Sequence, residues 1–403
     1  MGTLAAPPVS VIDLEKEYLL QNYARLPIIL TRGRGCYVYD SNGKRYLDMI
    51  TGIGVNALGY AHPRLTKVIR EQAGKIIHTS NLYYNEYQGP LAERIVRISG
   101  LNRVFFANSG TESIEGALKM ARAHGRKIST EKYEIVSLDN SFHGRTFGSL
   151  SVTGQENYRR DFEPLLPGVH FVPRNDVTAL EQVVNERTAG IVLEYVQGEG
   201  GIFPLTEEYV RKARELATRF NALLIFDEIQ CGVGRPGTYF AYQLTDPPVM
   251  PDIMVAAKPL ACGIPLGIIV ANERAAASIG SGMHGSTFGG GPLACRAALE
   301  FFDVLDELLP QIAHTGSYFR MRLTELARKH SFIKEVRGVG LMIGVELDIP
   351  GKPLVLDAME NGLLINATHD VVLRMLPAYI VTEDHVDRAV SVLAKVFKRA
   401  GSK

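Results

Sequence analysis

Apolar residues in the middle of the chain gather in short runs separated by segments of helical spacing. Runs rich in β-branched and aromatic residues predict strands at 104–106, 134–138, 169–172, 191–193 and 223–226. Between these runs, apolar residues recur with the period of an amphipathic helix. Strands that alternate with helices predict a mostly parallel sheet with helices packed on its faces, so the expected fold class is α/β.

The first hundred residues show a different pattern. The segment 11–23 has amphipathic spacing, and 36–47 contains two short β-runs on either side of Asn42-Gly43, a pair that tight hairpins favour. Pro63 stands where a helix can begin, and 91–98 repeats the helical period. We therefore expect a peripheral, non-sheet region around the hairpin.

The end of the chain predicts a small α+β unit. A long helical region at 293–329 is followed by an apolar strand at 341–347, a helix, two strands up to residue 376 and an amphipathic helix from Glu383. No long linker separates the units, so they should pack closely. We expect an N-terminal segment that packs with the small domain, a large domain and a small C-terminal domain, at 1–60, 61–300 and 301–403.

Composition narrows the class of protein. The chain has 403 residues, of which 46% are hydrophobic and 22% charged, as in an ordinary globular protein. A formal charge of +1 gives no basic field to attract nucleic acid, and no window of about 18 apolar residues predicts a membrane span. We therefore expect small-molecule partners, no nucleic acid and no membrane.

Cysteines and histidines lack the spacing of metal sites. The cysteines are spread along the chain without paired spacing: Cys36, Cys231, Cys262 and Cys295. The histidines considered as ligands are equally scattered: His62, His78, His143 and His170. The N-terminus shows no basic and apolar targeting signal. We expect no metal, reduced thiols and a cytoplasmic protein.

Two charged residues follow the most apolar of the predicted strands. Asp227 ends the run 223–226, and Lys258 follows a further short run, Val255-Ala256-Ala257. Because parallel sheets bind ligands beyond the carboxyl ends of their strands, Asp227 should face a site. An acid there can hold a metal, act as a base or pair with a ring nitrogen, and a lysine in dry surroundings can form a Schiff base. Together they suggest pyridoxal phosphate, whereas either residue alone is better explained as a turn cap or a surface charge.

Other predicted strand ends carry groups that suit such a cofactor. Small and hydroxyl residues follow the strand at 104–106 and open a helix, where N–H groups can bind phosphate: Ser109, Gly110 and Thr111. After the next strand, Phe142 can cover a planar ring and Arg145 can hold a carboxylate. Glu199 lies in a glycine-rich loop after a third strand. Such convergence is hard to attribute to caps and turns.

Residues 232–237 match the G-x-G-x-x-G pattern of dinucleotide-binding loops, but their context differs. Pro236 interrupts the pattern, the following residues do not clearly open a helix, and the preceding strand is not the first of the series. A nicotinamide site is therefore disfavoured.

The order of these motifs resembles the class III pyridoxal-phosphate aminotransferases over nearly the whole chain. The resemblance is carried by Asn108-Ser109-Gly110-Thr111-Glu112, Phe142-His143-Gly144-Arg145-Thr146, Gln197-Gly198-Glu199-Gly200-Gly201, Asp227-Glu228-Ile229-Gln230, Lys258 and Gly285-Ser286-Thr287-Phe288. It implies fold type I, with a large domain that binds pyridoxal 5'-phosphate and a small α+β domain built from the C-terminus and the N-terminal segment. It also implies a transaminase that forms a homodimer with shared active sites.

The resemblance gives roles to matching residues. It implies that Lys258 holds the cofactor covalently and shuttles a proton, and that Asp227 pairs with the protonated pyridine nitrogen. It places further residues at the cofactor: Ser109, Gly110, Thr111, Phe142, His143, Gln230 and, from the neighbouring subunit, Thr287. It places others at the substrates: Tyr23, Arg145, Glu199, Ser286 and Arg374.

Within the class, the segments 52–59 and 78–85 most resemble enzymes of arginine biosynthesis. They imply transfer of the terminal amino group of N2-acetylornithine to 2-oxoglutarate, giving N-acetylglutamate 5-semialdehyde and glutamate. Alternative donors are ornithine, succinylornithine, 4-aminobutyrate and a carrier-linked lysine, and an aminomutase of glutamate 1-semialdehyde is an alternative of another reaction class. Pro377-Ala378-Tyr379 departs from the usual Pro-Pro after the residue matching Arg374, the end expected to bind 2-oxoglutarate.

One site must accept a donor with a single carboxylate and then an acceptor with two. One arginine must therefore be silent in the first half-reaction. We expect Glu199, flanked by glycines, to neutralise Arg374 and later to move away. The alternative is that Glu199 is only a loop acid.

Overall fold

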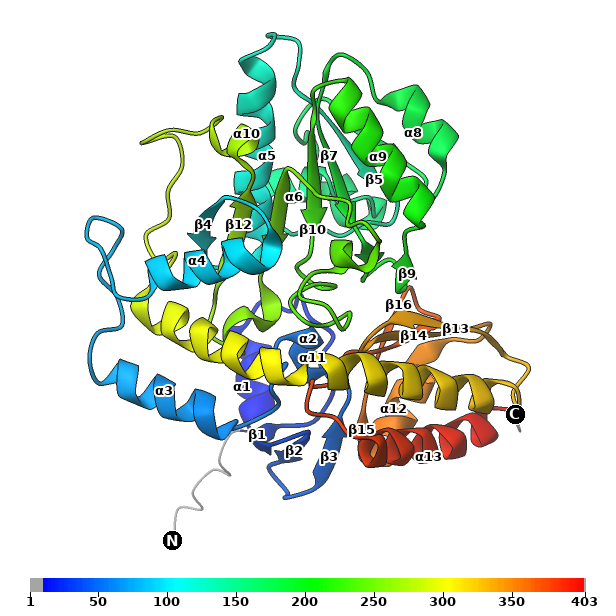
Figure 1. The fold of residues 1–403 in the computed structure, drawn as a ribbon. Helices are drawn as coiled ribbons and strands as arrows, with labels where there is room; N and C mark the ends of the chain where they lie inside the picture. The colour runs from blue at the N-terminus through cyan, green and yellow to red at the C-terminus, as the bar shows by residue number, and fades with distance from the viewer. Residues whose placement is uncertain (1–9, 402–403) are drawn as a thin grey trace, which may run out of the picture.

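The structure, a computed structural model, describes residues 10–401. A seven-stranded sheet organises the upper half of the molecule (Figure 1), in the order β4 (Arg103–Ala107), β12 (Gly267–Ala271), β11 (Ile253–Ala256), β10 (Leu223–Asp227), β7 (Thr188–Glu194), β5 (Glu134–Leu138) and β6 (Val169–Val172). β12 runs antiparallel to both neighbours, and the other adjacent strands run parallel. The predicted α/β class with a mostly parallel sheet is confirmed.

Side chains that alternate along the central strands build a core on both faces of this sheet. In β10, Leu223 and Ile225 pack on the face covered by α5 (Gly110–Arg126), whereas Leu224 and Phe226 pack on the face covered by α9 (Glu207–Arg219). Every residue of β10 and β7 is buried. Burial on both faces explains why the run 223–226 contains no polar residue.

Two four-stranded sheets lie at the other end of the molecule. One has the order β1 (Leu30–Arg34), β2 (Tyr37–Asp40), β3 (Arg45–Asp48) and β15 (Leu363–Leu364). The other has the order β13 (Ile333–Val339), β14 (Met342–Leu347), β17 (Val372–Met375) and β16 (Asn366–Thr368). A two-stranded ribbon, β8 (Val196–Gln197) with β9 (Phe203–Pro204), lies near the latter.

The prediction for the N-terminal region is correct for the hairpin and wrong for the segments around it. β2 and β3 pair antiparallel, so the predicted hairpin is confirmed. The expectation of a non-sheet region is wrong, because β1 pairs with β2 and β3 pairs in parallel with β15. β15 lies far from β3 in the sequence and has only two residues, so no local sequence pattern predicts this pairing.

Helix α11 (Pro292–Ala327) has 36 residues and connects the central sheet with the C-terminal sheet (Figure 1). It packs against α3 (Pro63–Ala73) and α4 (Gln88–Ser99) at one end and against β13 and α13 (Glu383–Ala400) at the other. The predicted boundary at residue 300 falls inside this helix. The limits of the domains stay a prediction.

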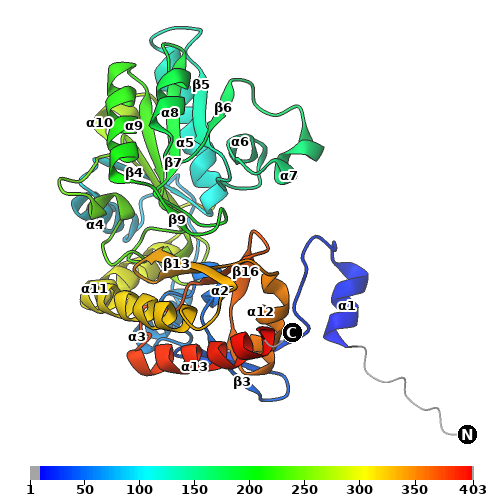
Figure 2. The ribbon, with the colours of Figure 1, turned by 90° about the vertical axis from the view of Figure 1, so that its right-hand side faces the viewer.

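The N-terminal helix α1 (Val11–Tyr18) is shorter than the predicted 11–23 and buries none of its residues. Figure 2 shows it beside the body of the chain. The remaining helices of four or more residues are α2 (Thr51–Gly54), α6 (Phe147–Ser151), α7 (Glu156–Arg159), α8 (Val177–Val183), α10 (Glu273–Ala276) and α12 (Gly351–Glu360), with the 3₁₀ turns η2 (Ala241–Leu244) and η3 (Lys258–Ala261). No helix within residues 10–401 is long and apolar enough to cross a membrane.

Candidate active site

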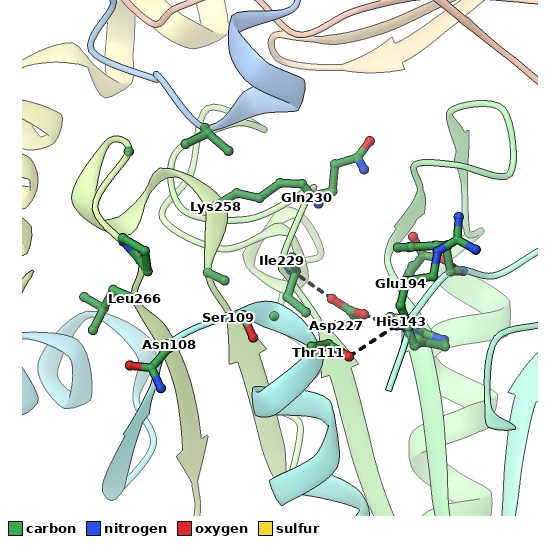
Figure 3. A pocket seen from close by; sticks show the side chains of 18 of the residues that line it. Asn108, Ser109, Thr111, His143, Glu194, Asp227, Ile229, Gln230, Lys258 and Leu266 are labelled. Carbon is green, nitrogen blue, oxygen red and sulfur yellow. Dashed lines mark hydrogen bonds and ion pairs between the residues drawn. The ribbon is translucent and has the colours of Figure 1, made fainter. Parts of the chain in front are cut away.

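A cavity of about 370 Å³ opens at the carboxyl ends of the central strands (Figure 3). Its lining comes from the segments that leave the sheet: 108–111 after β4, 142–145 after β5, Glu194 at the end of β7, Asp227 at the end of β10 and Lys258 after β11. Sequence-distant polar residues thus meet at one edge of the sheet, where parallel sheets bind ligands.

Asp227 is held at the bottom of this cavity by two hydrogen bonds. Its Oδ1 accepts from the backbone N–H of Ile229 at 2.9 Å, and its Oδ2 lies 2.7 Å from Nδ1 of His143. Burial alone would lower the pKa of His143, but the hydrogen bond and charge of Asp227 outweigh it and raise that pKa. The carboxylate is therefore fixed in direction and buried, as a partner for a ring cation must be.

Glu194 is a second buried acid that the sequence pattern does not single out. Its Oε2 accepts from the N–H of Phe142 at 3.0 Å and its Oε1 from the N–H of Gly198 at 3.1 Å. Burial raises the pKa of Glu194 to about 7, although the charge of His143 works against the shift. Glu194 thereby connects the segment that carries Phe142 with the glycine-rich loop. Its position as the last residue of a buried strand was the available signal.

The N-terminus of α5 forms a cradle for an anion. Ser109 is the N-cap, and its Oγ accepts from the N–H of Glu112 at 3.3 Å. The N–H groups of Gly110 and Thr111, the first residues of the helix, have no acceptor among the described residues and remain open to a ligand. A Cβ at Gly110 would lie 2.7 Å from Cδ1 of Ile229, so only glycine leaves this space free.

Lys258 lines the same cavity from η3 (Figure 3). Burial lowers the pKa of its amine, and the charges of Glu199 and Asp227 offset part of that shift. A neutral amine is the form that attacks a carbonyl, so a buried lysine is suited to holding an aldehyde cofactor. The amine, the buried acid and the anion cradle together fit pyridoxal phosphate, and the apolar side chains of Phe142 and Ile229 also line the space.

Glu199 and Arg374 meet beside the cavity. Nη1 of Arg374, a buried residue of β17, lies 2.5 Å from Oε1 of Glu199. Burial would raise the pKa of Glu199, but the charge and hydrogen bond of Arg374 outweigh it and lower that pKa. Gln230 joins the pair by donating to Glu199 at 3.2 Å and accepting from Arg374 at 3.0 Å. The expected ion pair is present, and its role as a gate stays a prediction.

The backbone of the Glu199 loop is anchored to the C-terminal sheet. Oγ1 of Thr368 donates to the carbonyl oxygen of Glu199 at 2.6 Å. The guanidinium of Arg337 donates twice to the carbonyl oxygen of Gly201, at 2.7 and 2.9 Å. These bonds resist a swing of the whole loop despite its glycines. Release of Arg374 therefore requires rotation of the Glu199 side chain.

Three predicted site residues lie away from the cavity within this single chain. Tyr23 is 69% exposed and carries the guanidinium of Arg25 on its ring. Ser286 and Thr287 line a separate, smaller hollow, where Oγ of Ser286 accepts from Nδ2 of Asn108 at 3.0 Å.

Arg145, in contrast, lines the main cavity. It is exposed at the rim, with its guanidinium 3.9 Å from the centroid of the Tyr158 ring.

Two other kinds of site find no support in the described part of the chain. No group of three or more His, Cys, Asp or Glu residues within residues 10–401 could hold a metal ion. The glycine pattern at 232–237 is not followed by an α-helix, the next element being the turn η2, so the context of a dinucleotide loop is missing.

Comparison with known proteins agrees with this geometry. The model of the family described as "Aminotransferase class-III" matches residues 18–397. The chain therefore belongs to the class III aminotransferases, which are pyridoxal-phosphate-dependent transaminases. When bound, the cofactor supplies a ring that takes up the electron pair released as a substrate C–H bond breaks.

Individual relatives are similar over almost the full chain. The acetylornithine aminotransferase of Methanocaldococcus jannaschii is 48% identical over 96% of this chain and 97% of its own length. That of Aquifex aeolicus is 47% identical over 94% of this chain and 99% of its own length. The solved ornithine aminotransferase of Toxoplasma gondii superposes with a TM-score of 0.92 at 32% identity, covering 96% of this chain and 94% of the other.

Proposed function

We propose that the enzyme transfers the terminal amino group of N2-acetylornithine to 2-oxoglutarate, giving N-acetylglutamate 5-semialdehyde and glutamate in arginine biosynthesis. The observation that carries the proposal is the ion pair of Glu199 with Arg374 beside the cavity, because a reversible pair lets one site alternate between acids with one and two carboxylates. The acetylornithine aminotransferases that resemble this chain support the choice of donor.

In this proposal the chain's own groups divide the work. Lys258 holds the cofactor and moves a proton at its amine, and Asp227, oriented by His143, keeps the pyridine nitrogen protonated. Phe142 covers the ring, while Gln230 lies near the ring hydroxyl. The open N–H groups after Ser109 bind the phosphate: Gly110 and Thr111. Arg145 at the rim binds the carboxylate of the donor and Arg374 that of the acceptor.

Two copies of the chain are proposed to complete each site. Leu82, Tyr83 and Tyr84 are 85%, 71% and 105% exposed, and Phe288, next to Thr287, is 67% exposed. Exposed apolar residues on this scale suit an interface. A second copy covering them would bring Thr287 to the phosphate, and Tyr23, on the exposed N-terminal segment, to the substrate.

We also propose a reducing, cytoplasmic location, which the four free cysteines support.

A screen of amino donors in the first half-reaction tests the proposed substrate. Loss of cofactor absorbance is followed in single turnovers with acetylornithine, succinylornithine, ornithine, 4-aminobutyrate and glutamate. Acetylornithine is expected to react with the highest kcat/KM, and activity should require 2-oxoglutarate for the second half. Faster reaction of ornithine, the substrate named for one structural neighbour, would replace the donor. Isomerisation of glutamate 1-semialdehyde without an acceptor would replace the reaction class.

Removal of the Glu199 carboxylate tests the gate. Glu199→Ala should leave Arg374 open, so glutamate should gain as a donor against acetylornithine by about tenfold, or about 1.4 kcal/mol. The ratio of single-turnover rates for the two donors measures the effect. Glu199→Gln is the matched control for charge, since it keeps the side-chain shape and should show a similar gain. An unchanged donor ratio with the cofactor still bound would reject the gate.

A further inference from the structure

The glycine-rich segment 232–237 holds a buried arginine that the proposed chemistry does not use. Arg235 is only 1% exposed, and none of its hydrogen bonds within the described chain goes to a carboxylate. Burying a cation without an acid is costly, so its retention calls for compensating contacts. Those contacts define what the residue does.

The guanidinium of Arg235 binds backbone carbonyl oxygens from segments far apart in sequence. Nη1 donates to the carbonyl oxygens of Leu341, at 3.2 Å, and of Pro377. Nη2 lies 3.5 Å from the carbonyl oxygen of Gly54, which directly precedes Val55 in the cavity lining. Leu341 directly precedes β14, and Pro377 closely follows β17. One side chain therefore connects two strands of the C-terminal sheet with the last residue of α2, which adjoins the cavity lining.

Tyr379 also takes part in this connection. Its ring centroid lies 4.6 Å from the guanidinium of Arg235, and the residue is fully buried. Its hydroxyl donates to the carbonyl oxygen of Val233 at 2.7 Å, and its N–H donates to that of Ala57 at 2.6 Å. Tyr379 directly follows Pro377-Ala378, where this chain departs from the usual Pro-Pro of its class.

Close backbone packing leaves this connection little slack. The N–H of Leu341 donates to the carbonyl oxygen of Arg235 at 2.9 Å. A Cβ at Gly340 would lie 2.3 Å from that same oxygen, and a Cβ at Gly234 would lie 3.1 Å from the Tyr379 ring. Since both glycines also have a positive φ, a larger residue at either position would be strained as well as crowded.

Arg374 lies on the strand whose end Arg235 holds. β17 pairs with β14 so that Arg374 stands opposite Gly344, and Arg235 binds beside the start of β14 and the end of β17. The N–H of Leu376 also donates to the carbonyl oxygen of Met49 at 2.6 Å. The position of Arg374 relative to Lys258 therefore depends on how this strand end is fastened.

We propose that Arg235, together with Tyr379, is a positioning residue that fixes Arg374 at the cavity and so sets the affinity for the dicarboxylate acceptor. The inference rests on the proposed function, in which Arg374 binds 2-oxoglutarate. Donor binding, for which Arg374 is masked by Glu199, should depend on Arg235 far less.

The test measures the two half-reactions separately in the holoenzyme. Arg235→Met removes the hydrogen-bond donors of the guanidinium but keeps a long apolar side chain. It should raise the KM for 2-oxoglutarate by about tenfold or more, because Arg374 would be misplaced. The KM for the amino donor should stay within about twofold, as only the acceptor uses Arg374. Backbone amides of the segment 372–379 should exchange hydrogen faster. Equal changes in both half-reactions, or none, would overturn the proposal.

Tyr379→Phe serves as the milder second variant, and it alone decides should Arg235→Met fail to fold. It removes the hydrogen bond to Val233 and keeps the ring, so the same selective rise in KM is expected at a smaller size. An unchanged acceptor KM would overturn the proposal.

Arg374→Gln separates failure of this inference from failure of the proposed function. If Arg374→Gln leaves the KM for 2-oxoglutarate unchanged, the assigned role of Arg374 fails together with everything that rests on it. If Arg374→Gln raises that KM and Arg235→Met does not, only the positioning role fails. In the double variant, Arg235→Met should add little to the effect of Arg374→Gln, because both act on one interaction. Full additivity would contradict the proposal.

Discussion

Replacement of Lys258 by alanine is expected to abolish turnover. In the proposed function this residue supplies both the amine that holds the cofactor and the base that moves the proton, and loss of a general base alone costs about 10² to 10⁴ in rate. Burial already lowers the pKa of this amine toward the neutral form that both tasks require. Lys258→Arg should fail as completely, because it restores the positive charge without a nucleophile.

Borohydride reduction followed by peptide mapping locates the attachment independently of activity. Reduction fixes the cofactor to the lysine that carries it, and the label is expected on Lys258. Lys132 is the internal comparison, since it is also buried, but its amine donates to the carbonyl oxygens of Glu186 and Phe220 away from the cavity. A label on any lysine other than Lys258 would refute the assignment.

Asp227→Asn is expected to cost at least about 10³ in the rate of the first half-reaction, or about 4 kcal/mol of transition-state stabilisation. The asparagine can keep the hydrogen bond to Ile229, so the shape of the site should survive. The negative charge is lost, so in the proposed function the ring nitrogen loses the partner that keeps it protonated. Single-turnover rates at equal cofactor occupancy measure this loss, and near-normal turnover would show that the ring is held differently.

His143 gives a second, cofactor-independent readout of the same variant. Its pKa is raised in the folded protein by the hydrogen bond and charge of Asp227, which outweigh burial. Removing that charge should lower the pKa of His143, and NMR titration of the imidazole would follow the change. A pKa that did not move would mean that Asp227 does not control this histidine.

The central strands could be predicted because burial on both faces writes an apolar run into the sequence. β10 and β7 show this most clearly. Asp227 was predicted to follow the apolar run of β10, and Glu199 to lie in the loop after the run of β7. The strands β11, β12 and β13 were not predicted. Ile253–Ala256 and Gly267–Ala271 are short apolar runs that are fully buried, and periodicity does not distinguish such a run from a buried helical segment. Ile333–Val339 carries charged residues on a partly exposed surface, so it lacks the apolar run of a central strand.

The residues of the cavity likewise fall into those that the local sequence pattern predicts and those that it does not. Asp227 and the helix-opening triplet 109–111 follow short apolar runs, so the local pattern placed them at the carboxyl ends of strands. Glu194 could not be distinguished from an ordinary strand end, since its importance comes from two N–H groups that other segments deliver. The pairing of Glu199 with Arg374 joins segments 175 residues apart, and only the resemblance to a family pointed to it.

The long helix α11 has a mechanical consequence. At 1.5 Å per residue its 36 residues form a rod about 54 Å long, fastened to both the central and the C-terminal regions. Any change in the angle between those regions must therefore bend the rod or shear it along one partner. Pro310 lies inside the helix and removes one bond from its ladder, so bending stiffness is lowest there. Any change in that angle would thus meet an elastic resistance in this helix and would bend it first at Pro310.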